Sequence, residues 1–394
     1  NGDPILSVDY GIAYEKEHAE EFLQGKTVTM VSCTGRVMSV IQQQLLRSFA
    51  GTGLNDMASG LLLFVGYLAP IRPMNEKMSE LIHSSVPWQY STLRTETFGV
   101  EFELSCVVNT GMSKMAYQIS RQTGVRVNNL MEKQLRNPLY IIGILDIDDY
   151  ASDDKWIIKR DGSLRGSSDY CHSKTFEFIS RKLEGEQGLL ECHQVLGVLN
   201  DVAAIHLNDT MAMHVHIGVQ GFSLSSLKKV CANFVLFEYV IDTFMLPSRR
   251  NNKYCKSHTV ELETHGNKQQ TYDLILACKS NDDLFDLINP GSKPRYYKLN
   301  MQNLTKTGKR LTVEFRQHSA TTNYRSVEAW VRFCMNFVYN SVDCVLPPVV
   351  FDESTEPGSE DDTLFDVLFD SLIQDQKLKL YYKVQREELL LVTS

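Results

Sequence analysis

The chain has no run of about 18 consecutive apolar residues, the length that a membrane-spanning helix requires, anywhere in its 394 residues. It also shows no basic stretch followed by an apolar one at its start, so no export signal is visible. Its nine cysteines are scattered without a CxxC pair, which is typical of free thiols in a reducing compartment rather than of a disulfide framework. We therefore expect a cytoplasmic protein with no membrane partner.

Excess positive charge and glycine-rich phosphate loops are missing as well. A net charge of -8 argues against a general nucleic-acid-binding surface, so we expect no nucleic-acid partner. Neither the GxxxxGK pattern of a P-loop nor GxGxxG occurs. If ATP binds, it does so without a P-loop or a Rossmann turn.

The segment from Met211 to Val219 alternates apolar and small or polar residues with a period of two, which indicates a half-buried strand. His214 and His216 lie on the same face of it, roughly 6.5–7 Å apart. A single histidine in such a strand is usually a satisfied core or surface residue. Two on one face also suit a metal or phosphate site, because imidazole is a common ligand for both.

Three further strands share this design, with apolar residues on one side and ionisable residues on the other. Residues 97–104 carry Glu101 and Glu103, residues 175–180 carry Glu177, and residues 310–318 carry the alternating set Glu314, Arg316 and His318. One such strand alone is most often a solvated edge. If all four belong to one sheet, their carboxylates would repel each other strongly unless cations neutralise them. Oxygen ligands with one or two imidazoles favour Mg²⁺ or Mn²⁺, the cations of phosphoryl transfer.

The rest of the chain is predicted more coarsely. The spacing of apolar residues indicates helices at 37–49, 113–122, 187–204, 223–245 and 324–345, with Ser223 and Asn323 as caps. It also indicates a strand at 26–32, a hairpin over 258–276 with its turn at Gly266-Asn267, and a strand at 296–300. Residues 247–253 form a basic loop that is either solvated or binds an anion.

Taken together and in order, these segments resemble the amidoligase family of carboxylate–amine ligases, within the glutamine synthetase and glutamate–cysteine ligase superfamily. The resemblance covers roughly 98–345. It rests on Gly99-Val100-Glu101-Phe102-Glu103, Asp161-Gly162-Ser163-Leu164, Phe176-Glu177-Phe178-Ile179-Ser180, Met213-His214-Val215-His216-Ile217-Gly218, Ser248-Arg249-Arg250-Asn251, Tyr296 to Asn300, and Thr312-Val313-Glu314-Phe315-Arg316-Gln317-His318.

The resemblance implies an α+β fold, with a curved antiparallel catalytic sheet of glutamine-synthetase type backed by helices. It places the catalytic domain at 96–346, between an N-terminal accessory segment at 1–95 and an acidic linker with a helical extension at 347–394. It implies ATP-dependent amide formation through an acyl-phosphate, with ATP and Mg²⁺ or Mn²⁺ as cofactors. The acid and amine substrates are not named by the sequence, and amino acids, a peptide or a protein are all candidates.

The resemblance also implies roles for individual residues. The metal ligands would be Glu101, Glu103, Glu177, His214 and Glu314. His216 and Arg316 would contact the phosphates and act in catalysis, Arg249 and Arg250 would contact phosphate or a substrate carboxylate, and Asp161 and His318 would serve the amine side. We expect substrate choice to lie in loops such as 251–256.

Two other functions fit the same residues. A phosphotransferase acting on a guanidino or amine group would use a related sheet and the same metals. A non-catalytic relative could serve as a binding module, although a decayed site need not keep all four glutamates together with His214 and Arg316.

Overall fold

The computed structural model describes residues 93–107, 111–131, 154–160, 164, 173–262, 266–305, 310–353 and 363–393, and three short strands before them. Residues 1–89 and 382–394 form one unit and residues 90–381 the other. The first unit contains a small antiparallel sheet of β1 (Ile12–Ala13), β2 (Val28–Ser32) and β3 (Val37–Val40). None of the helices in the described ranges is long and apolar enough to cross a membrane.

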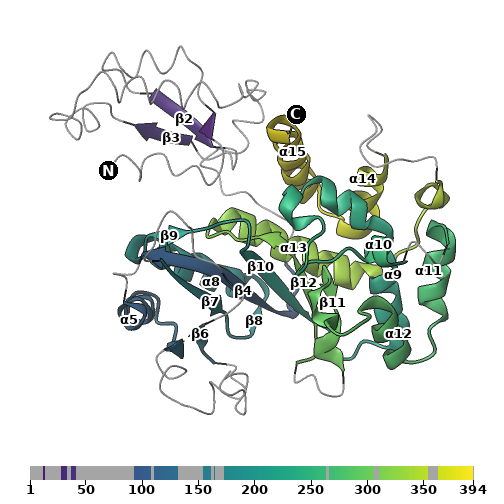
Figure 1. Cartoon of the computed structure of the whole chain (residues 1–394), viewed down its shortest axis with the longest axis horizontal. Coiled ribbons are helices and arrows are strands. Elements are labelled where there is room, and N and C mark those ends of the chain that lie inside the picture. Colours follow the sequence, from purple (N-terminus) through teal and green to yellow (C-terminus); the bar gives the residue numbers. More distant parts are fainter. Residues whose placement is uncertain are drawn as a thin grey trace. The chain divides into compact units, whose positions relative to one another are not determined.

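The second unit is built on a nine-stranded sheet in which β5 and β6 are parallel and the other pairs are antiparallel. Its main path runs β11-β12-β10-β4-β7-β6-β5, and β8 and β9 pair with β4. In this path β12, β10 and β4 are consecutive neighbours and lie side by side (Figure 1). The strands are β4 (Thr97–Val107), β5 (Val127–Asn129), β6 (Trp156–Lys159), β7 (Ser173–Ile179), β8 (Leu183–Glu184), β9 (Ile205–His206), β10 (Ala212–Gly218), β11 (Leu299–Asn300) and β12 (Thr312–Ser319).

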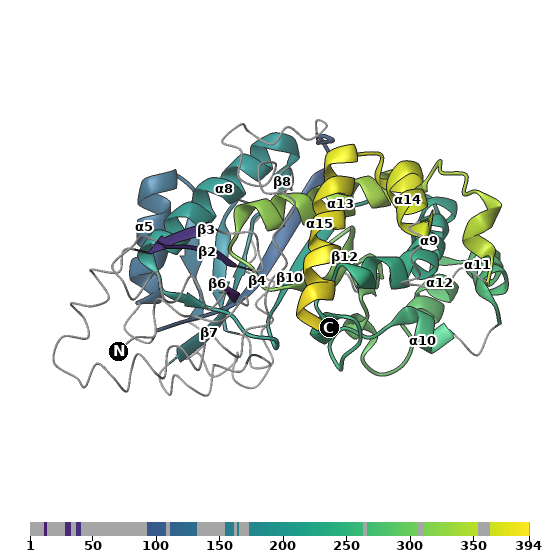
Figure 2. The same ribbon diagram turned by 90° about the horizontal axis from the view of Figure 1, so that it is seen from above.

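Helices pack against the apolar face of this sheet and beside its two ends. The α-helices of this unit are α5 (Met112–Thr123), α8 (Gly185–Val202), α9 (Leu224–Thr243), α10 (His258–Leu262), α11 (Lys268–Ala277), α12 (Asn281–Ile288), α13 (Tyr324–Ser341) and α14 (Thr363–Val367). A further helix, α15 (Gln376–Thr393), begins in this unit and ends in the first. The shorter helical turns are η2 (Pro247–Arg249), η4 (Pro294–Tyr296), η5 (Gln302–Leu304), η6 (Pro348–Phe351) and η7 (Leu368–Ile373). In both views α5 lies at the β5–β6 end of the sheet, and α10, α11 and α12 gather at the β11–β12 end (Figures 1 and 2).

The apolar core explains why the strands with alternating apolar and polar residues lie in this sheet with their apolar side toward the helices. Val100, Phe102, Val215 and Phe315 are fully buried on the apolar face. Phe315 meets the aromatic rings of α9 and α13, with ring centroids 5.8 Å from Phe234 and 6.1 Å from Trp330 and from Phe337. Edge-to-face aromatic packing of this kind adds to the stabilisation from burial. The apolar half of each strand thus fixes its polar half on the opposite face.

The predicted strands around 97–104, 175–180, 211–219 and 310–318 and the predicted helices from 113 onward are confirmed, as are the caps at Ser223 and Asn323. The Ser223 hydroxyl accepts a hydrogen bond from the amide of Ser226, and the Asn323 side chain accepts one from that of Arg325. The α+β class with a mostly antiparallel sheet is likewise confirmed. The division into accessory, catalytic and linker segments stays a prediction.

The hairpin expected at 258–276 is wrong, because both of its arms are helices. One side chain caps the start of each helix. Glu238 accepts hydrogen bonds from the amides of His258 and Thr259 at the start of α10. Asn267, read as a turn residue, is the N-cap of α11 and forms a capping box with Gln270.

Two further expectations need correction. Residues 37–40 begin a strand rather than a helix, which agrees with the strand preference of the β-branched Val37 and Val40; residues 41–49 lie outside the described part. The strand expected at 296–300 is shorter, since only Leu299–Asn300 pairs with β12 and Tyr296 closes a helical turn.

Candidate functional site

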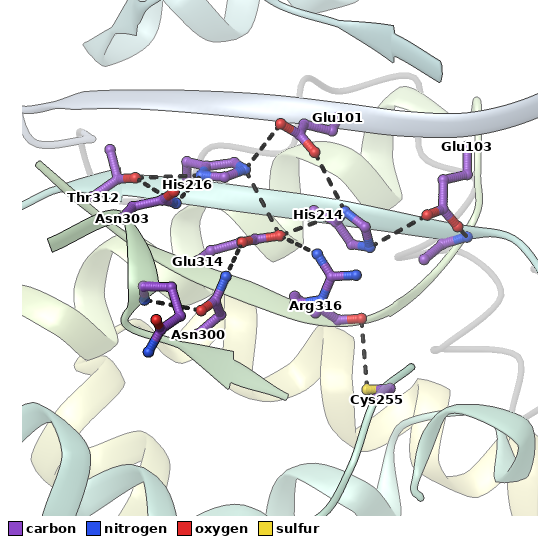
Figure 3. Close-up of polar contacts among 12 residues, drawn as sticks. Glu101, Glu103, His214, His216, Cys255, Asn300, Asn303, Thr312, Glu314 and Arg316 are labelled. Atoms are coloured by element: carbon purple, nitrogen blue, oxygen red, sulfur yellow. Dashed lines mark hydrogen bonds and ion pairs between the residues drawn. The ribbon is translucent and has the colours of Figure 1, made fainter. Parts of the chain in front are cut away.

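The polar face of β12, β10 and β4 brings the predicted carboxylates and imidazoles together. His214 is paired directly with Glu101 of β4, and His216 is paired with Glu314 of β12. Side chains of directly paired residues project from the same face of a sheet. Figure 3 shows the resulting cluster, with His214 and His216 between the glutamates of the two neighbouring strands.

Glu101, His216 and Glu314 form the tightest group in the cluster. One ligand atom from each lies within 4.8 Å of the others, a spacing that can hold a metal ion. His216 Nε2 is 3.2 Å from Glu101 Oε1 and 3.9 Å from Glu314 Oε1. That nitrogen is buried and forms no hydrogen bond. Its nearest contact is the ion-pair distance to Glu101, so its lone pair has room for a ligand.

His214 lies deeper and contacts three carboxylates. Its Nδ1 is 3.5 Å from Glu101 and 3.6 Å from Glu314, and its Nε2 is 3.7 Å from Glu103. The second oxygen of Glu103 accepts a hydrogen bond of 2.7 Å from the amide of Ala212. Glu103 is therefore fixed on β10 by the backbone, and the strand pairing holds His214 between Glu101 and Glu103.

Burial alone would raise the pKa of the Glu101 carboxyl, but His216 and His214 hold that pKa well below its usual range. The pKa of Glu314 is also lowered, because Arg316 and the two histidines outweigh its burial. Burial would lower the pKa of His216, and the charges of Glu101 and Glu314 raise it instead. The shifts show that these oppositely charged groups stabilise one another, with Glu101 and Glu314 held ionised.

Side chains that were not predicted from the sequence orient the group of Glu101, His216 and Glu314, which we call the triad. Asn300 donates a 2.6 Å hydrogen bond to Glu314 Oε2. His216 Nδ1 lies 3.3 Å from Thr312 Oγ1 and 3.3 Å from Asn303 Nδ2. The tautomer with its proton on Nδ1 donates it to Thr312 and leaves the Nε2 lone pair available, as in histidines that bind metals.

Arg316 completes the cluster, and the backbone around it explains why His318 does not join. The pairing of β10 with β12 shifts register between Met213 and Val215, which is the mark of a β-bulge. One extra residue of β12 reverses the alternation after Arg316. His318 is paired with Met213 and packs at a tilt against Trp330 in the core, with ring centroids 5.5 Å apart. The expectation that it shares a face with Glu314 and Arg316 is wrong.

Arg316 itself stays on the polar face. Its Nη1 lies 2.5 Å from Glu314 Oε1, and its Nε is buried without a hydrogen bond. Burial would lower the pKa of Arg316, but Glu314 raises it, so the guanidinium is always charged.

The two predicted phosphate-contacting arginines of the basic loop bind backbone carbonyls. Arg249 is buried in η2 and donates from Nη2 to the carbonyl of Arg316 at 2.6 Å. Arg250 donates from Nε to the carbonyl of Met245 at 3.1 Å. Cys255 Sγ also lies 3.6 Å from the Arg316 carbonyl. In this structure Arg249 supports the bulge, and a contact of either arginine with a ligand stays a prediction.

The remaining predicted residues lie beside the cluster or outside the described part. Glu177 of β7 is paired directly with Glu103, and its Oε2 is 2.9 Å from Lys159 Nζ. Lys159 was not singled out, although its place one strand before Glu177 could have suggested the pairing. Asp161 lies outside the described residues, and its role stays a prediction.

The residues that form this cluster fall inside a family match. Residues 94–338, more than half of the chain, match the protein-family model described as "Putative amidoligase enzyme". The chain belongs to the amidoligase family. The amidoligase match spans β4, β7, β10 and β12, the strands that carry the predicted site, and confirms the resemblance drawn from the sequence. The family description makes this a ligase-type enzyme. No curated protein matches the chain significantly.

Proposed function

We propose that the chain is an ATP-dependent carboxylate–amine ligase that uses Mg²⁺ or Mn²⁺ and a sheet of glutamine-synthetase type to form an amide bond through an acyl-phosphate. Membership of the amidoligase family supports a ligase. The observation that carries the proposal further is the triad of a half-buried Glu101 with the buried His216 and Glu314, in which one imidazole nitrogen is left without a hydrogen bond.

The donor set fits a hard divalent cation. Glu101, Glu103 and Glu314 offer carboxylate oxygens, and His216 offers an imidazole nitrogen, a mixture typical of Mg²⁺ and Mn²⁺ sites. His216 was predicted as a phosphate contact, and the geometry adds it to the proposed ligands. A bound cation would neutralise the carboxylates and polarise the phosphoryl oxygens of ATP.

Arg316 is the residue best placed to act on the phosphoryl group. An oxygen of the substrate carboxylate attacks the γ-phosphorus of ATP, the bond to the bridging oxygen breaks, and ADP leaves. Negative charge spreads over the transferred group, and a guanidinium stabilises it. Arg316 uses Nη1 to bind Glu314, while its buried Nε still lacks an acceptor. Glu314 thereby sets the orientation of the guanidinium.

The second half-reaction needs a neutral amine. Its nitrogen attacks the acyl carbon, the carbon–oxygen bond to phosphate breaks, and a base takes the proton lost by nitrogen. We keep Asp161 as the proposed base. His318 is not proposed for this step, because it is buried on the opposite face and burial lowers its pKa to about 4.

ADP release from ATP in the presence of mixed amino acids or peptides tests the proposal, with Mg²⁺ or Mn²⁺ added or withheld. Turnover should require the cation and fall roughly 100-fold or more in Glu101→Gln and in Glu314→Gln. The exposed Glu184 provides a matched control, and Glu184→Gln should keep full activity.

Binding of Mn²⁺, followed by electron paramagnetic resonance, separates the metal assignment from the reaction. The wild-type protein and Glu184→Gln should bind Mn²⁺, and Glu101→Gln should not. Metal binding without ADP release from any acid and amine pair would favour the non-catalytic binding module. Turnover unchanged in both glutamate variants would overturn the proposed site.

A further inference from the structure

Two stretches of this acidic chain contain no acidic residue at all. Residues 243–260 hold four lysines or arginines and residues 287–313 hold six, with no aspartate or glutamate in either, although the chain as a whole has a net charge of -8. Charge of one sign gathered in two separate segments is informative only if the fold brings those segments together.

The fold does bring them together. The amide of Lys256 donates to the carbonyl of Tyr296 at 2.8 Å, and the amide of Lys298 donates to the carbonyl of Lys256 at 3.1 Å. The rings of Tyr254 and Tyr296 meet edge to face, with centroids 5.2 Å apart. These contacts place four cations on one surface, which we call the basic patch: Lys253, Lys256, Lys293 and Arg295.

The basic patch adjoins the carboxylate cluster. The carbonyl of Lys298 accepts a 2.8 Å hydrogen bond from the amide of Arg316, so the loops of the patch continue the edge of β12. The charge of Arg295 acts on both Arg316 and Glu314. The patch therefore borders Arg316 and Glu314 along this strand edge.

The cations of the patch have no carboxylate of their own. Within the described residues, none of the four forms an ion pair, and each instead lies over a tyrosine ring, 5.0–5.7 Å from its centroid. Lys293 and Arg295 both lie over Tyr296, and Lys253 lies over Tyr254. The rings hold the cations by cation–π attraction. Since those rings already have cations over them, the patch is better suited to anionic groups than to the stacking of a nucleobase.

We infer that the basic patch binds carboxylates of the substrate on which the neighbouring site acts, and that this substrate is an acidic peptide. The inference rests on the proposed ligase function. The reacting carboxylate accounts for one anionic group, and Arg316 with the metal ligands already serves the triphosphate. Four further cations on the approach fit additional carboxylates along a chain of glutamate or aspartate residues.

Fluorescence anisotropy of a labelled oligo-glutamate peptide tests this inference without ATP, metal or turnover. Binding to the full-length wild-type protein should weaken roughly tenfold in the triple variant Lys253→Gln, Lys293→Gln, Arg295→Gln, because three exposed charge contacts are lost. The matched control removes three exposed cations at the other end of the unit: Lys114→Gln, Arg121→Gln, Lys182→Gln. It has the same net charge and should bind like the wild type, and a labelled oligo-glutamine peptide should not bind.

Other results would overturn the inference. Equal weakening in both triple variants would show an effect of net charge alone. No binding of oligo-glutamate by the wild type, or binding that the patch variant leaves unchanged, would remove the acidic peptide as the substrate class. Loss of a fluorescent ATP analogue from the patch variant, with oligo-glutamate binding kept, would assign the cations to phosphate. Failure of ADP release would contradict the ligase proposal and leave this binding result standing.

Discussion

Two buried clusters of charged side chains lie near β12, and they differ in how their carboxylates are satisfied. Between β12 and α9, Lys298 Nζ lies 2.7 Å from Glu238 and 2.8 Å from Asp242. Glu238 also accepts two backbone hydrogen bonds of 2.8 and 3.0 Å. On the polar face, the contacts of Glu101 among the described residues are longer: His216 at 3.2 Å, His214 at 3.5 Å and Arg310 at 3.9 Å.

The difference separates a cluster that stabilises the fold from a cluster that can bind a ligand. Each carboxylate of the Lys298 cluster has short donors within the protein, although His258 Nδ1 and Gln317 Oε1 beside them form no hydrogen bond. A buried charge with such partners specifies packing and leaves nothing for a ligand. In the carboxylate cluster Glu314 and Glu103 also have short donors, but the shortest contact of Glu101 is 3.2 Å, and His216 Nε2 has no hydrogen bond. The burial of their charged groups does not distinguish the two clusters. The longer contacts of Glu101 do.

Lys298→Met should give the largest change in stability and should test whether the first cluster is structural. Removing the ammonium leaves Glu238 and Asp242 buried without their cation, which costs about 3–5 kcal/mol in the free energy of unfolding. Urea unfolding measures this, with the exposed Lys182→Met as a control that should change by less than about 0.5 kcal/mol. A loss below about 1 kcal/mol for Lys298→Met would remove the distinction between the clusters.

The pH dependence of unfolding sharpens the same contrast. Burial lowers the pKa of His258, which contacts Glu238, to about 4. A histidine whose folded-state pKa is depressed contributes stability that is complete above about pH 6.5 and is lost as the pH falls toward 4. The loss is about 3 kcal/mol for His258, and His318 adds a similar amount. Unfolding of His258→Gln measured from pH 7 to pH 4 should show a decline smaller than that of the wild type by about 3 kcal/mol. An unchanged decline would contradict a neutral buried His258.

Mn²⁺ should stabilise the protein through the carboxylate cluster. Binding to the folded state alone raises the free energy of unfolding by about 2.7 kcal/mol at a cation concentration of about 100 times Kd. Thermal unfolding with and without Mn²⁺ should show this gain in the wild type and in Glu184→Gln, and no gain in Glu101→Gln. The same gain in all three proteins would place the cation elsewhere.

Gln317→Leu should have the smallest effect. Gln317 Nε2 donates to Asp242 Oδ1 at 2.7 Å, while its Oε1 is buried without a hydrogen bond. The substitution removes the hydrogen bond to Asp242, but it also removes a buried oxygen that has no hydrogen bond. These two effects nearly offset each other, so urea unfolding should show a decrease of only about 1 kcal/mol in the free energy of unfolding. The exposed Gln122→Leu on α5 is the control. A loss above about 3 kcal/mol would mean that the bulge itself depends on this amide.

The sequence was sufficient to predict the strands of the site, because apolar residues alternate with glutamate or histidine in all of them. It could not predict the bulge after Arg316, since strict alternation is the only rule that a strand sequence offers, and His318 was misplaced for that reason. Asn303 and Thr312 were missed because such side chains occur in most loops and strand ends without a role. The helices at 258–277 were predictable in part, since Asn267 and Gln270 have the spacing of a capping box.

The bulge has a consequence for the control of the site from a distance. Because of it, two nearby residues of β12 face opposite sides of the sheet. Arg316 faces the carboxylates, and His318, two residues further on, packs against Trp330 of α13. A shift of α13 would therefore move His318 and, through two residues of backbone, the guanidinium of Arg316. Substitutions under α13 are therefore expected to change the proposed activity without altering Arg316 or the carboxylates.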